Sequence, residues 1–100
     1  MNTAIQVTMY LNESDKWSQI LQMLRRENVA GACAFHAVAG FNGRSPVHTA
    51  TLVEAGGDVP VIIIFVDFEE HVSRVLPKLF ELAPNRLIVR ENVTIEQGTL

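Results

Sequence analysis

Hydrophobic and polar residues alternate along the first part of the chain, from residue 3 to residue 11. The apolar positions share one parity and are Ile5, Val7, Met9 and Leu11. The positions of the other parity are Gln6, Thr8 and Tyr10. A period of two residues places successive side chains on opposite faces of a strand. The pattern therefore predicts a half-buried β-strand over residues 3–11.

Two later segments have the spacing of amphipathic helices. The apolar stripe of the first comprises Trp17, Ile20, Leu21 and Leu24, and that of the second comprises Val72, Val75, Leu76, Leu79 and Leu82. The polar turn at residues 12–15 supplies N-cap candidates for the first helix. Asp67 is the expected N-cap of the second helix, in a capping box with Glu70. Pro77 lacks an N–H and is expected to kink that helix.

Apolar runs predict further strands over residues 32–38, 61–66 and 87–95, and a short one over 49–53. Residues 39–49 contain two glycines and a proline, which predicts an exposed, mobile loop. The main order is strand, helix, strand, strand, helix, strand. This order is typical of the α+β ferredoxin-like fold, a βαββαβ two-layer sandwich. We expect one domain over residues 1–100, with both helices on one face of a four-stranded antiparallel sheet.

The strand predicted at residues 61–66 is apolar at both parities. Ile62, Ile64 and Val66 therefore need cover on the sheet face that the helices leave open. Large exposed apolar patches are rare on monomers, which favours an oligomer. The alternative is that residues 39–58 of the same chain shield this face.

Composition and charge exclude several classes of protein. Hydrophobic residues make up 48% of the chain and charged residues 19%, which excludes a disordered chain. The net charge of -3 disfavours a nucleic-acid binder, although a few local cations suffice for one anionic ligand. Cys33 is the single cysteine, so no intrachain disulfide forms. With neither a signal-peptide pattern nor an apolar run of membrane-spanning length, the expected location is the cytoplasm.

Several short motifs follow one another in a specific order. They are Val29-Ala30-Gly31-Ala32, Val38-Ala39-Gly40-Phe41, Val47-His48-Thr49-Ala50, Asp58-Val59-Pro60-Val61-Ile62 and Val66-Asp67. Their joint order and spacing resemble a family of PII-like signalling proteins catalogued as a domain of unknown function. The last predicted strand, which begins Leu87-Ile88-Val89-Arg90, is similar as well. The resemblance covers most of residues 5–95.

This resemblance implies a homotrimer of ferredoxin-like subunits with their sheets facing inward. It implies that an adenine nucleotide (ADP, AMP, ATP or cyclic AMP) acts as an effector in clefts between subunits. Bicarbonate is the expected co-effector by analogy. A flexible T-loop, here at about residues 39–50, would carry the signal to a membrane transporter or an enzyme. No cofactor is required, and no nucleic acid is expected as a partner.

Two segments depart from the pattern of related proteins. The Gly-Phe-Gly of the family's loop is here Gly40-Phe41-Asn42-Gly43. Before the last strand, other PII proteins have a glycine-rich segment with a lysine, where this chain has Ala83-Pro84-Asn85-Arg86. The second departure speaks against the joint site for ATP and 2-oxoglutarate of those proteins.

The candidate ligand-binding residues lie in the loop and around the last strand. They are Gly40, Phe41, Asn42, Gly43, Arg44, His48, Thr49, Arg86 and Arg90. The loop glycines allow close backbone approach to an anion, and an arginine can contact a phosphate through two N–H groups. The alternative is an ordinary polar loop, with Arg90 paired to a carboxylate such as Glu91 or Glu54 and His48 a plain surface histidine.

Metal binding within one chain and catalysis are both disfavoured. Cys33 and His36 are three residues apart, which places them on opposite faces of a strand. Cys33 is expected to be buried and inert, His36 to lie at an interface, and His71 to be solvated. The chain has no nucleophile elbow, no Walker lysine and no carboxylate cluster, so an enzyme is not expected. The alternative function is a CutA-like metal- or small-molecule-binding trimer, which predicts metal-dependent stabilisation.

Overall fold

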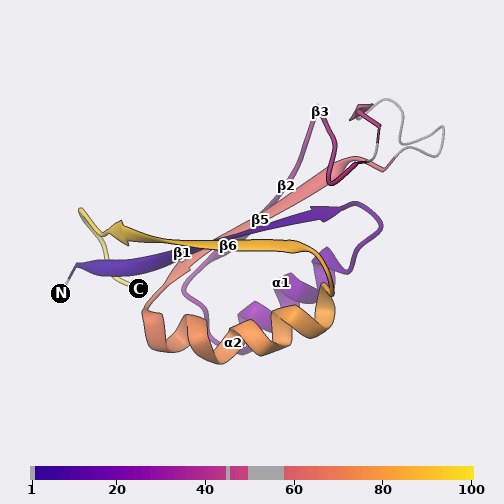
Figure 1. Ribbon diagram of the computed structural model, residues 1–100. Helices are drawn as coiled ribbons and strands as arrows, with labels where there is room; N and C mark the ends of the chain where they lie inside the picture. Colours follow the sequence, from indigo (N-terminus) through magenta and orange to yellow (C-terminus); the bar gives the residue numbers. More distant parts are fainter. Residues whose placement is uncertain (1, 45, 50–57) are drawn as a thin grey trace.

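The computed structural model describes residues 2–44, 46–49 and 58–100. Its elements along the chain are β1 (Thr3–Asn12), α1 (Trp17–Arg26), β2 (Ala32–His36), β3 (Ala39–Gly40), β4 (His48–Thr49), β5 (Pro60–Asp67), α2 (Glu69–Leu82) and β6 (Leu87–Thr94). Figure 1 shows the two helices side by side below one sheet. The predicted ferredoxin-like fold is confirmed, with β1, β2, β5 and β6 as its four main strands.

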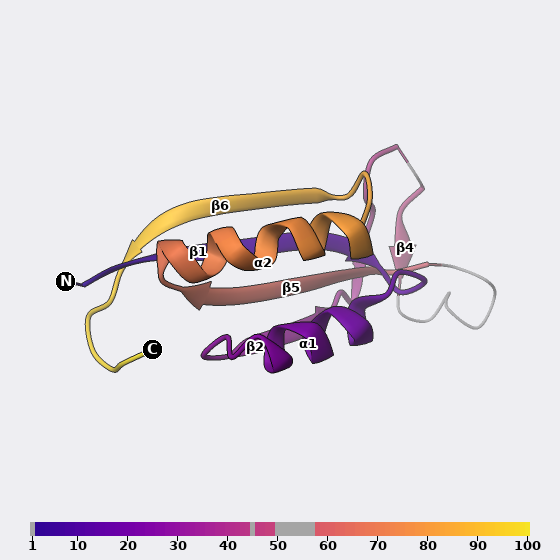
Figure 2. The same ribbon diagram turned by 90° about the horizontal axis from the view of Figure 1, so that it is seen from below.

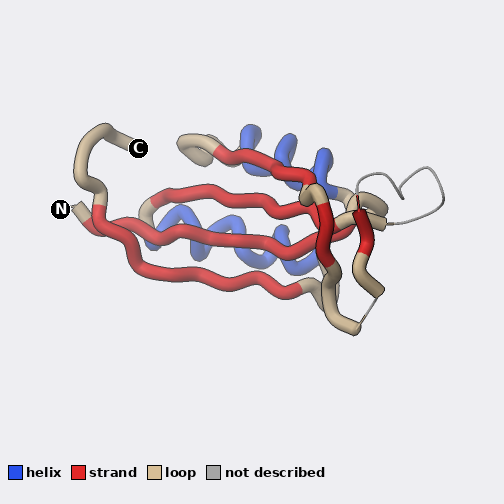
Figure 3. Tube along the Cα trace, turned by 90° about the horizontal axis from the view of Figure 1, so that it is seen from above, coloured by secondary structure: helices blue, strands red, loops and turns tan. Residues whose placement is uncertain are grey.

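The main sheet has the order β2-β5-β1-β6, and every neighbouring pair is antiparallel. Both helices cover the same face, as the view from below shows (Figure 2). The view from above shows the other face, on which no helix lies (Figure 3). We call the side without helices the outer face. Within the described part of the chain, no helix combines the length and the apolar character needed to cross a membrane.

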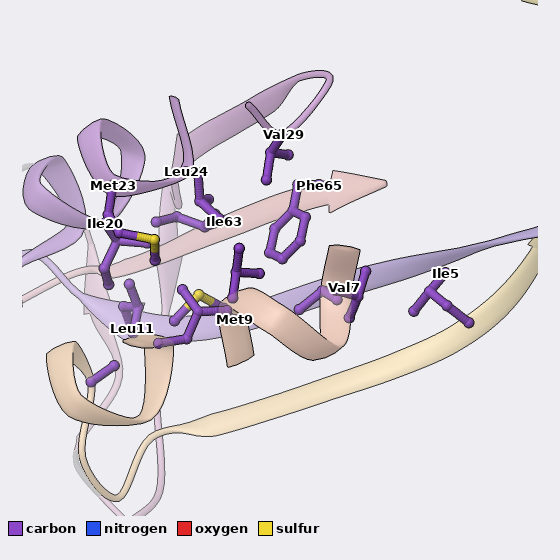
Figure 4. Packing of buried hydrophobic residues seen from close by; sticks show 14 of the residues in the cluster. Ile5, Val7, Met9, Leu11, Ile20, Met23, Leu24, Val29, Ile63 and Phe65 are labelled. Atoms are coloured by element: carbon purple, nitrogen blue, oxygen red, sulfur yellow. The ribbon is translucent and has the colours of Figure 1, made fainter. Parts of the chain in front are cut away.

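The core lies between the helices and the sheet (Figure 4). The side chains of β1 with odd numbers, Ile5, Val7, Met9 and Leu11, point into it, as the alternation predicted. Ile20, Met23 and Leu24 of α1 meet them, together with Ile63 and Phe65 of β5 and Val72, Val75 and Leu79 of α2. On the two central strands, β1 and β5, the odd-numbered side chains are thus buried against the helices.

The outer face is apolar in rows that cross the sheet. One row comprises Phe35, Ile62, Tyr10 and Leu87, and the next comprises Cys33, Ile64, Thr8 and Val89. In the isolated chain Phe35 is 53% exposed and Leu87 is 61% exposed. The expectation that Cys33 is buried was wrong for the single chain, because Cys33 lies on this open face and is exposed.

Neither helix begins with the predicted side-chain cap. The residue before α1 is Lys16 and the residue before α2 is Phe68, and neither makes a side-chain capping hydrogen bond. Asp67 is 4% exposed, and its Oδ1 accepts the Phe68 N–H at 2.7 Å. Its Oδ2 lies 3.3 Å from the Ala30 nitrogen and 2.8 Å from His71 Nδ1. Asp67 is therefore paired with Phe68, Ala30 and His71, and the predicted capping box with Glu70 was wrong.

A short hairpin stands at one end of the sheet, in the segment predicted to be a loop. Ala39 of β3 pairs with Thr49 of β4, and Gly40 pairs with His48. In Figure 1 this hairpin rises on the side of the sheet away from the helices. Of the strand predicted at residues 49–53, only residue 49 is among the described residues. The expected T-loop at 39–50 also lies partly outside them, at residues 45 and 50.

Candidate functional site

A cavity of about 420 Å³ lies at the end of the sheet where β1 ends and β6 begins. Its lining residues are Tyr10, Phe41, Asn42, Gly43, Asn85, Arg86 and Leu87. The volume lies in the range of small-molecule sites, roughly 300–1,000 Å³. Three chain segments that are far apart in sequence meet here: the end of β1, the segment after β3, and the turn between α2 and β6.

Arg86 is a positively charged residue in the lining of this cavity, and it forms an ion pair with Asp15. The Arg86 Nε–H donates to Asp15 Oδ2 at 2.8 Å, and an Nη2–H donates to Asp15 Oδ1 at 3.1 Å. This fork uses two of the five N–H donors of a guanidinium group. Asn85 has a φ of 66°, a left-handed conformation that asparagine tolerates, and it directs the chain from α2 back into β6. A partly buried, oriented guanidinium group is well suited to bind an anion.

The segment after β3 supplies an aromatic ring, an amide and a glycine. The Asn42 Nδ2–H donates to the Leu11 carbonyl at 2.6 Å and to Asn12 Oδ1 at 2.8 Å, which anchors the segment to the end of β1. Phe41 is 57% exposed, and Gly43 has a φ of 61°. Phe41 and Tyr10 both line the cavity, and an aromatic ring is a group against which a planar ring can stack.

The structure therefore brings together four of the predicted residues: Phe41, Asn42, Gly43 and Arg86. The others lie elsewhere. Gly40, His48 and Thr49 form the β3–β4 hairpin, where a Cβ on Gly40 would come within 3.2 Å of the Pro60 side chain. Arg44 follows Gly43, is exposed, and does not line this cavity.

Arg90 has different surroundings from Arg86, although the two residues are only four positions apart in the sequence. It pairs in register with Val7, so it faces the helix side of the sheet. There Arg90 forms an ion pair with Glu69 at the start of α2. The two side chains line a separate cavity of about 240 Å³ with Asn92. The carboxylate partners considered from sequence differ: Glu91 accepts a hydrogen bond from Gln6, and Glu54 lies outside the described residues.

Sequence reasoning missed Tyr10, Asp15, Asn85 and Leu87 as parts of this site. Tyr10 and Leu87 are directly opposite each other in the β1–β6 register, on the outer face. The available signal for Tyr10 was an aromatic side chain among the polar, even-numbered positions near the end of β1. No local sequence pattern could relate Asp15 to this site, because its partner Arg86 is 71 residues away in the sequence.

Among residues 2–44, 46–49 and 58–100, no three His, Cys, Asp or Glu side chains gather closely enough to hold a metal ion. His36 pairs with Glu13 and contacts the edge of the Trp17 ring at a centroid distance of 5.2 Å. The chemistry that the described cavity favours is the binding of an anion that carries a planar ring.

The sequence profile of the DUF190 family, described as "Uncharacterized ACR", matches residues 4–95. A UPF0166 protein of Methanocaldococcus jannaschii is 34% identical over 96 residues, which covers 89% of this chain and 88% of the relative.

Two solved structures show the same fold at low sequence identity. One is CPII of Thiomonas intermedia, a nitrogen regulatory PII-like protein bound to ADP, AMP and bicarbonate. It has a TM-score of 0.68 and 19% identity, covering 95% of this chain and 90% of that chain. The other is CutA of Pyrococcus horikoshii, with a TM-score of 0.63 and 14% identity, covering 95% of this chain and 87% of that chain.

Proposed function

The chain belongs to the DUF190 family, and on this basis we propose that it is a PII-like regulator that binds an adenine nucleotide. ADP and AMP are the first candidates, with ATP and cyclic AMP as further ones and bicarbonate as co-effector. The similar CPII protein was solved with ADP, AMP and bicarbonate, which supports this choice. The protein acts by binding and signalling rather than by catalysis.

One observation carries the proposal: Arg86 shares a cavity with the Phe41-Asn42-Gly43 segment and with Tyr10. The Arg86 guanidinium provides positive charge for a phosphate, since arginine binds phosphate through paired N–H groups. The aromatic rings of Phe41 and Tyr10 provide stacking for the base. Gly43, with its positive φ, lets the backbone come close to the ligand.

The outer face supports a homotrimer with the cavity at the subunit boundary. Tyr10 and Leu87 line the cavity and also belong to the apolar row of the outer face. A second copy that covers this face would therefore border the cavity as well. Burial of the exposed Phe35 and Leu87 side chains provides the driving force for assembly.

The segment that includes Phe41 and Asn42 continues into the β3–β4 hairpin, away from the helices. A ligand that contacts Phe41 and Gly43 would therefore act directly on the start of the expected T-loop at residues 39–50. In this proposal the loop carries the signal to a membrane transporter or an enzyme.

Isothermal titration calorimetry tests the site. We expect wild-type protein to bind at least one of ADP, AMP, ATP and cyclic AMP, and Arg86→Ala to weaken that binding about 10- to 100-fold. The expected loss follows from about 1.5–3 kcal/mol for a charge-assisted hydrogen bond, at about 1.4 kcal/mol per tenfold change in affinity. Arg26→Ala is the matched control, because Arg26 is an exposed arginine on α1 that lines none of the cavities described above.

Equal nucleotide affinity for Arg86→Ala and wild type would remove this cavity from the proposal. A thermal-shift series with Cu²⁺ and Zn²⁺ runs in parallel, because a bound ligand raises the melting temperature. Stabilisation by a metal alone, with no nucleotide effect, would replace the nucleotide proposal by the CutA-like alternative.

A further inference from the structure

The turn between β1 and α1, residues 12–15, contacts three other parts of the molecule. It is closed internally, since the Asp15 N–H donates to the Asn12 carbonyl at 2.9 Å. The Asn12 N–H also donates to Asp15 Oδ2 at 2.8 Å. Asp15 Oδ2 thus closes the turn and also accepts the Arg86 Nε–H, while Asp15 Oδ1 accepts the Arg86 Nη2–H. A displacement of Asp15 would change the conformation of the whole turn.

The turn holds the chain that returns from the segment after β4. The Glu13 N–H donates to the Val59 carbonyl at 2.9 Å. Asp58 accepts two hydrogen bonds from Ser14, at 3.1 Å from the backbone nitrogen and 2.7 Å from Oγ. Residues 58–59, which lead into β5, are therefore fixed to the turn by three hydrogen bonds.

The turn also holds the chain that leaves β2. The Glu13 carboxylate pairs with His36, the last residue of β2. The next residue, Ala37, donates its N–H to the Pro60 carbonyl at 2.9 Å. The outgoing and returning ends of the 38–58 segment are thus joined to each other and to Glu13.

On the other side, the turn contacts two residues that line the Arg86 cavity. Asn12 Oδ1 accepts the Asn42 Nδ2–H, and Asp15 accepts the Arg86 fork. Residues 12–15 therefore stand between the candidate ligand site and both ends of the 38–58 segment. Asn12 and Asp15 contact the cavity side, whereas Glu13 and Ser14 contact the ends of the 38–58 segment.

We propose that turn 12–15 couples occupancy of the Arg86 cavity to the two ends of the 38–58 segment, with Asp15 as a positioning residue. The inference rests on the proposed function only in that an anion enters the cavity. A ligand phosphate competes with Asp15 for the N–H donors of Arg86, and the weakened pair loosens the turn. Because coupling between two sites is reciprocal, a change at Ser14 or Glu13 alters affinity for the anion in turn.

The first test needs no ligand and uses amide hydrogen exchange on the full chain. We expect Asp15→Asn to speed exchange of the Glu13 and Ala37 N–H groups at least threefold. The amides of β1 and β5 in the middle of the sheet serve as the internal reference, and their exchange stays unchanged. Ser18→Ala, an exposed serine in the first turn of α1, is the matched control. Unchanged exchange at both positions would overturn the coupling.

If Asp15→Asn lowered the stability of the whole protein, exchange would be faster at all amides. Glu13→Gln therefore provides a second, independent test of the coupling. It removes the charge that pairs with His36 and leaves the Asp15–Arg86 fork in place. We expect it to speed exchange at Ala37 while the reference amides keep their rates. A uniform increase for both variants would count against the proposal.

The second test uses ADP as the probe. Ser14 does not line the cavity, yet we expect Ser14→Ala to change the ADP dissociation constant about threefold or more. In the Asp15→Asn background the same change should have no effect, which a double-mutant cycle measures. Additive effects would overturn the coupling even if ADP binds. If wild type binds no nucleotide, the proposed function fails, while the exchange test still decides the coupling.

Discussion

At the scale of single residues, Glu27 and His71 show how a local expectation fails. His71 was expected to be solvated, but it is partly buried at the start of α2. Its Nδ1 lies 2.8 Å from Asp67 Oδ2, and its Nε2 lies 2.5 Å from the Glu27 carbonyl oxygen. The Glu27 carboxylate in turn accepts a hydrogen bond from Lys78 Nζ at 2.7 Å. The end of α1 is thus tied to α2 at two points.

The Glu27–Lys78 pair predicts a pH-dependent contribution to stability. The hydrogen bond from Lys78 holds the pKa of the Glu27 carboxyl below its ordinary value. Burial of the carboxyl raises this pKa, whereas nearby positive charges lower it further. Because the pKa of Glu27 is lower in the folded state, the ion pair contributes fully to stability above the ordinary carboxyl pKa of about 4.3. This contribution is lost as the pH falls through the lowered pKa of the folded state.

We therefore expect the difference in unfolding free energy between wild type and Glu27→Gln to shrink on acidification. Urea denaturation at pH 7, pH 4 and pH 3 measures it. Glu81→Gln, at an exposed position in α2, is the control and should show a smaller change with pH. A Glu27 difference that is constant over this range would mean that the ion pair does not stabilise the fold.

At the scale of elements, α2 runs from Glu69 to Leu82 with Pro77 inside it. Val72, Val75 and Leu79 bury its apolar face, while Pro77 lies on the exposed side. The helix continues past the proline to Leu82. Packing against the sheet therefore outweighs the hydrogen bond to the Ser73 carbonyl that proline cannot make.

Pro77→Ala should stabilise the protein. A proline inside a helix costs about 3 kcal/mol, and its smaller unfolded-state entropy returns about 1 kcal/mol at most, so we expect a gain on the order of 2 kcal/mol. Chemical denaturation measures the gain. Ser73→Ala on the same exposed side is the control, with an expected gain of about 0.5 kcal/mol or less. Equal gains for the two variants would show that the helix already accommodates the proline without strain.

At the scale of the whole molecule, the sheet has one face buried by the helices and one apolar face open (Figures 1 and 3). Ile62, Ile64 and Val66 alternate with the buried residues of β5 and lie on the open face. At one corner, Thr99 and Leu100 lie beside Cys33 and Ile64 along a shallow apolar cavity. The rest of the face includes the exposed Phe35, Leu87 and Val89, which supports assembly through this surface.

Ile64→Lys is expected to break the proposed oligomer, because a lysine would place a charge in the middle of the apolar rows. Size-exclusion chromatography with light scattering should show a smaller species than wild type, with circular dichroism confirming that the variant is folded. Gln19→Lys, on the exposed side of α1, is the control and should elute as wild type. Wild-type size for Ile64→Lys would mean that the outer face is not the subunit interface.

Much of the fold was predictable because its signals are short-range. The alternation of β1 and the stripes of both helices each depend on residues a few positions apart, and all three elements were confirmed. The apolar residues at both parities of β5 also placed Ile62, Ile64 and Val66 on the sheet face without helices, while the oligomer inferred from them stays a prediction. The N-caps were wrong, because Asp67 finds partners at Ala30 and His71 that outweigh a local cap.

The candidate site was predictable only in part. The loop glycines, together with the resemblance to PII-like proteins, indicated Phe41, Asn42, Gly43 and Arg86, and all four line the cavity. From the sequence, Arg86 just after the second helix and Arg90 on the last strand were both candidate ligand-binding residues. The strand register separates them, because Arg90 is opposite Val7 on the helix side while Arg86 lies before the strand and turns to Asp15.

The sequence by itself determined the two helices, the four main strands and their order, since period and turn chemistry act within a few residues. The tertiary structure alone decided which charges meet. Asp15 and Arg86 are 71 residues apart, and Ser14 and Asp58 are 44 apart, so no local pattern relates them. Their contacts exist because the antiparallel register brings the end of β1 next to the starts of β5 and β6.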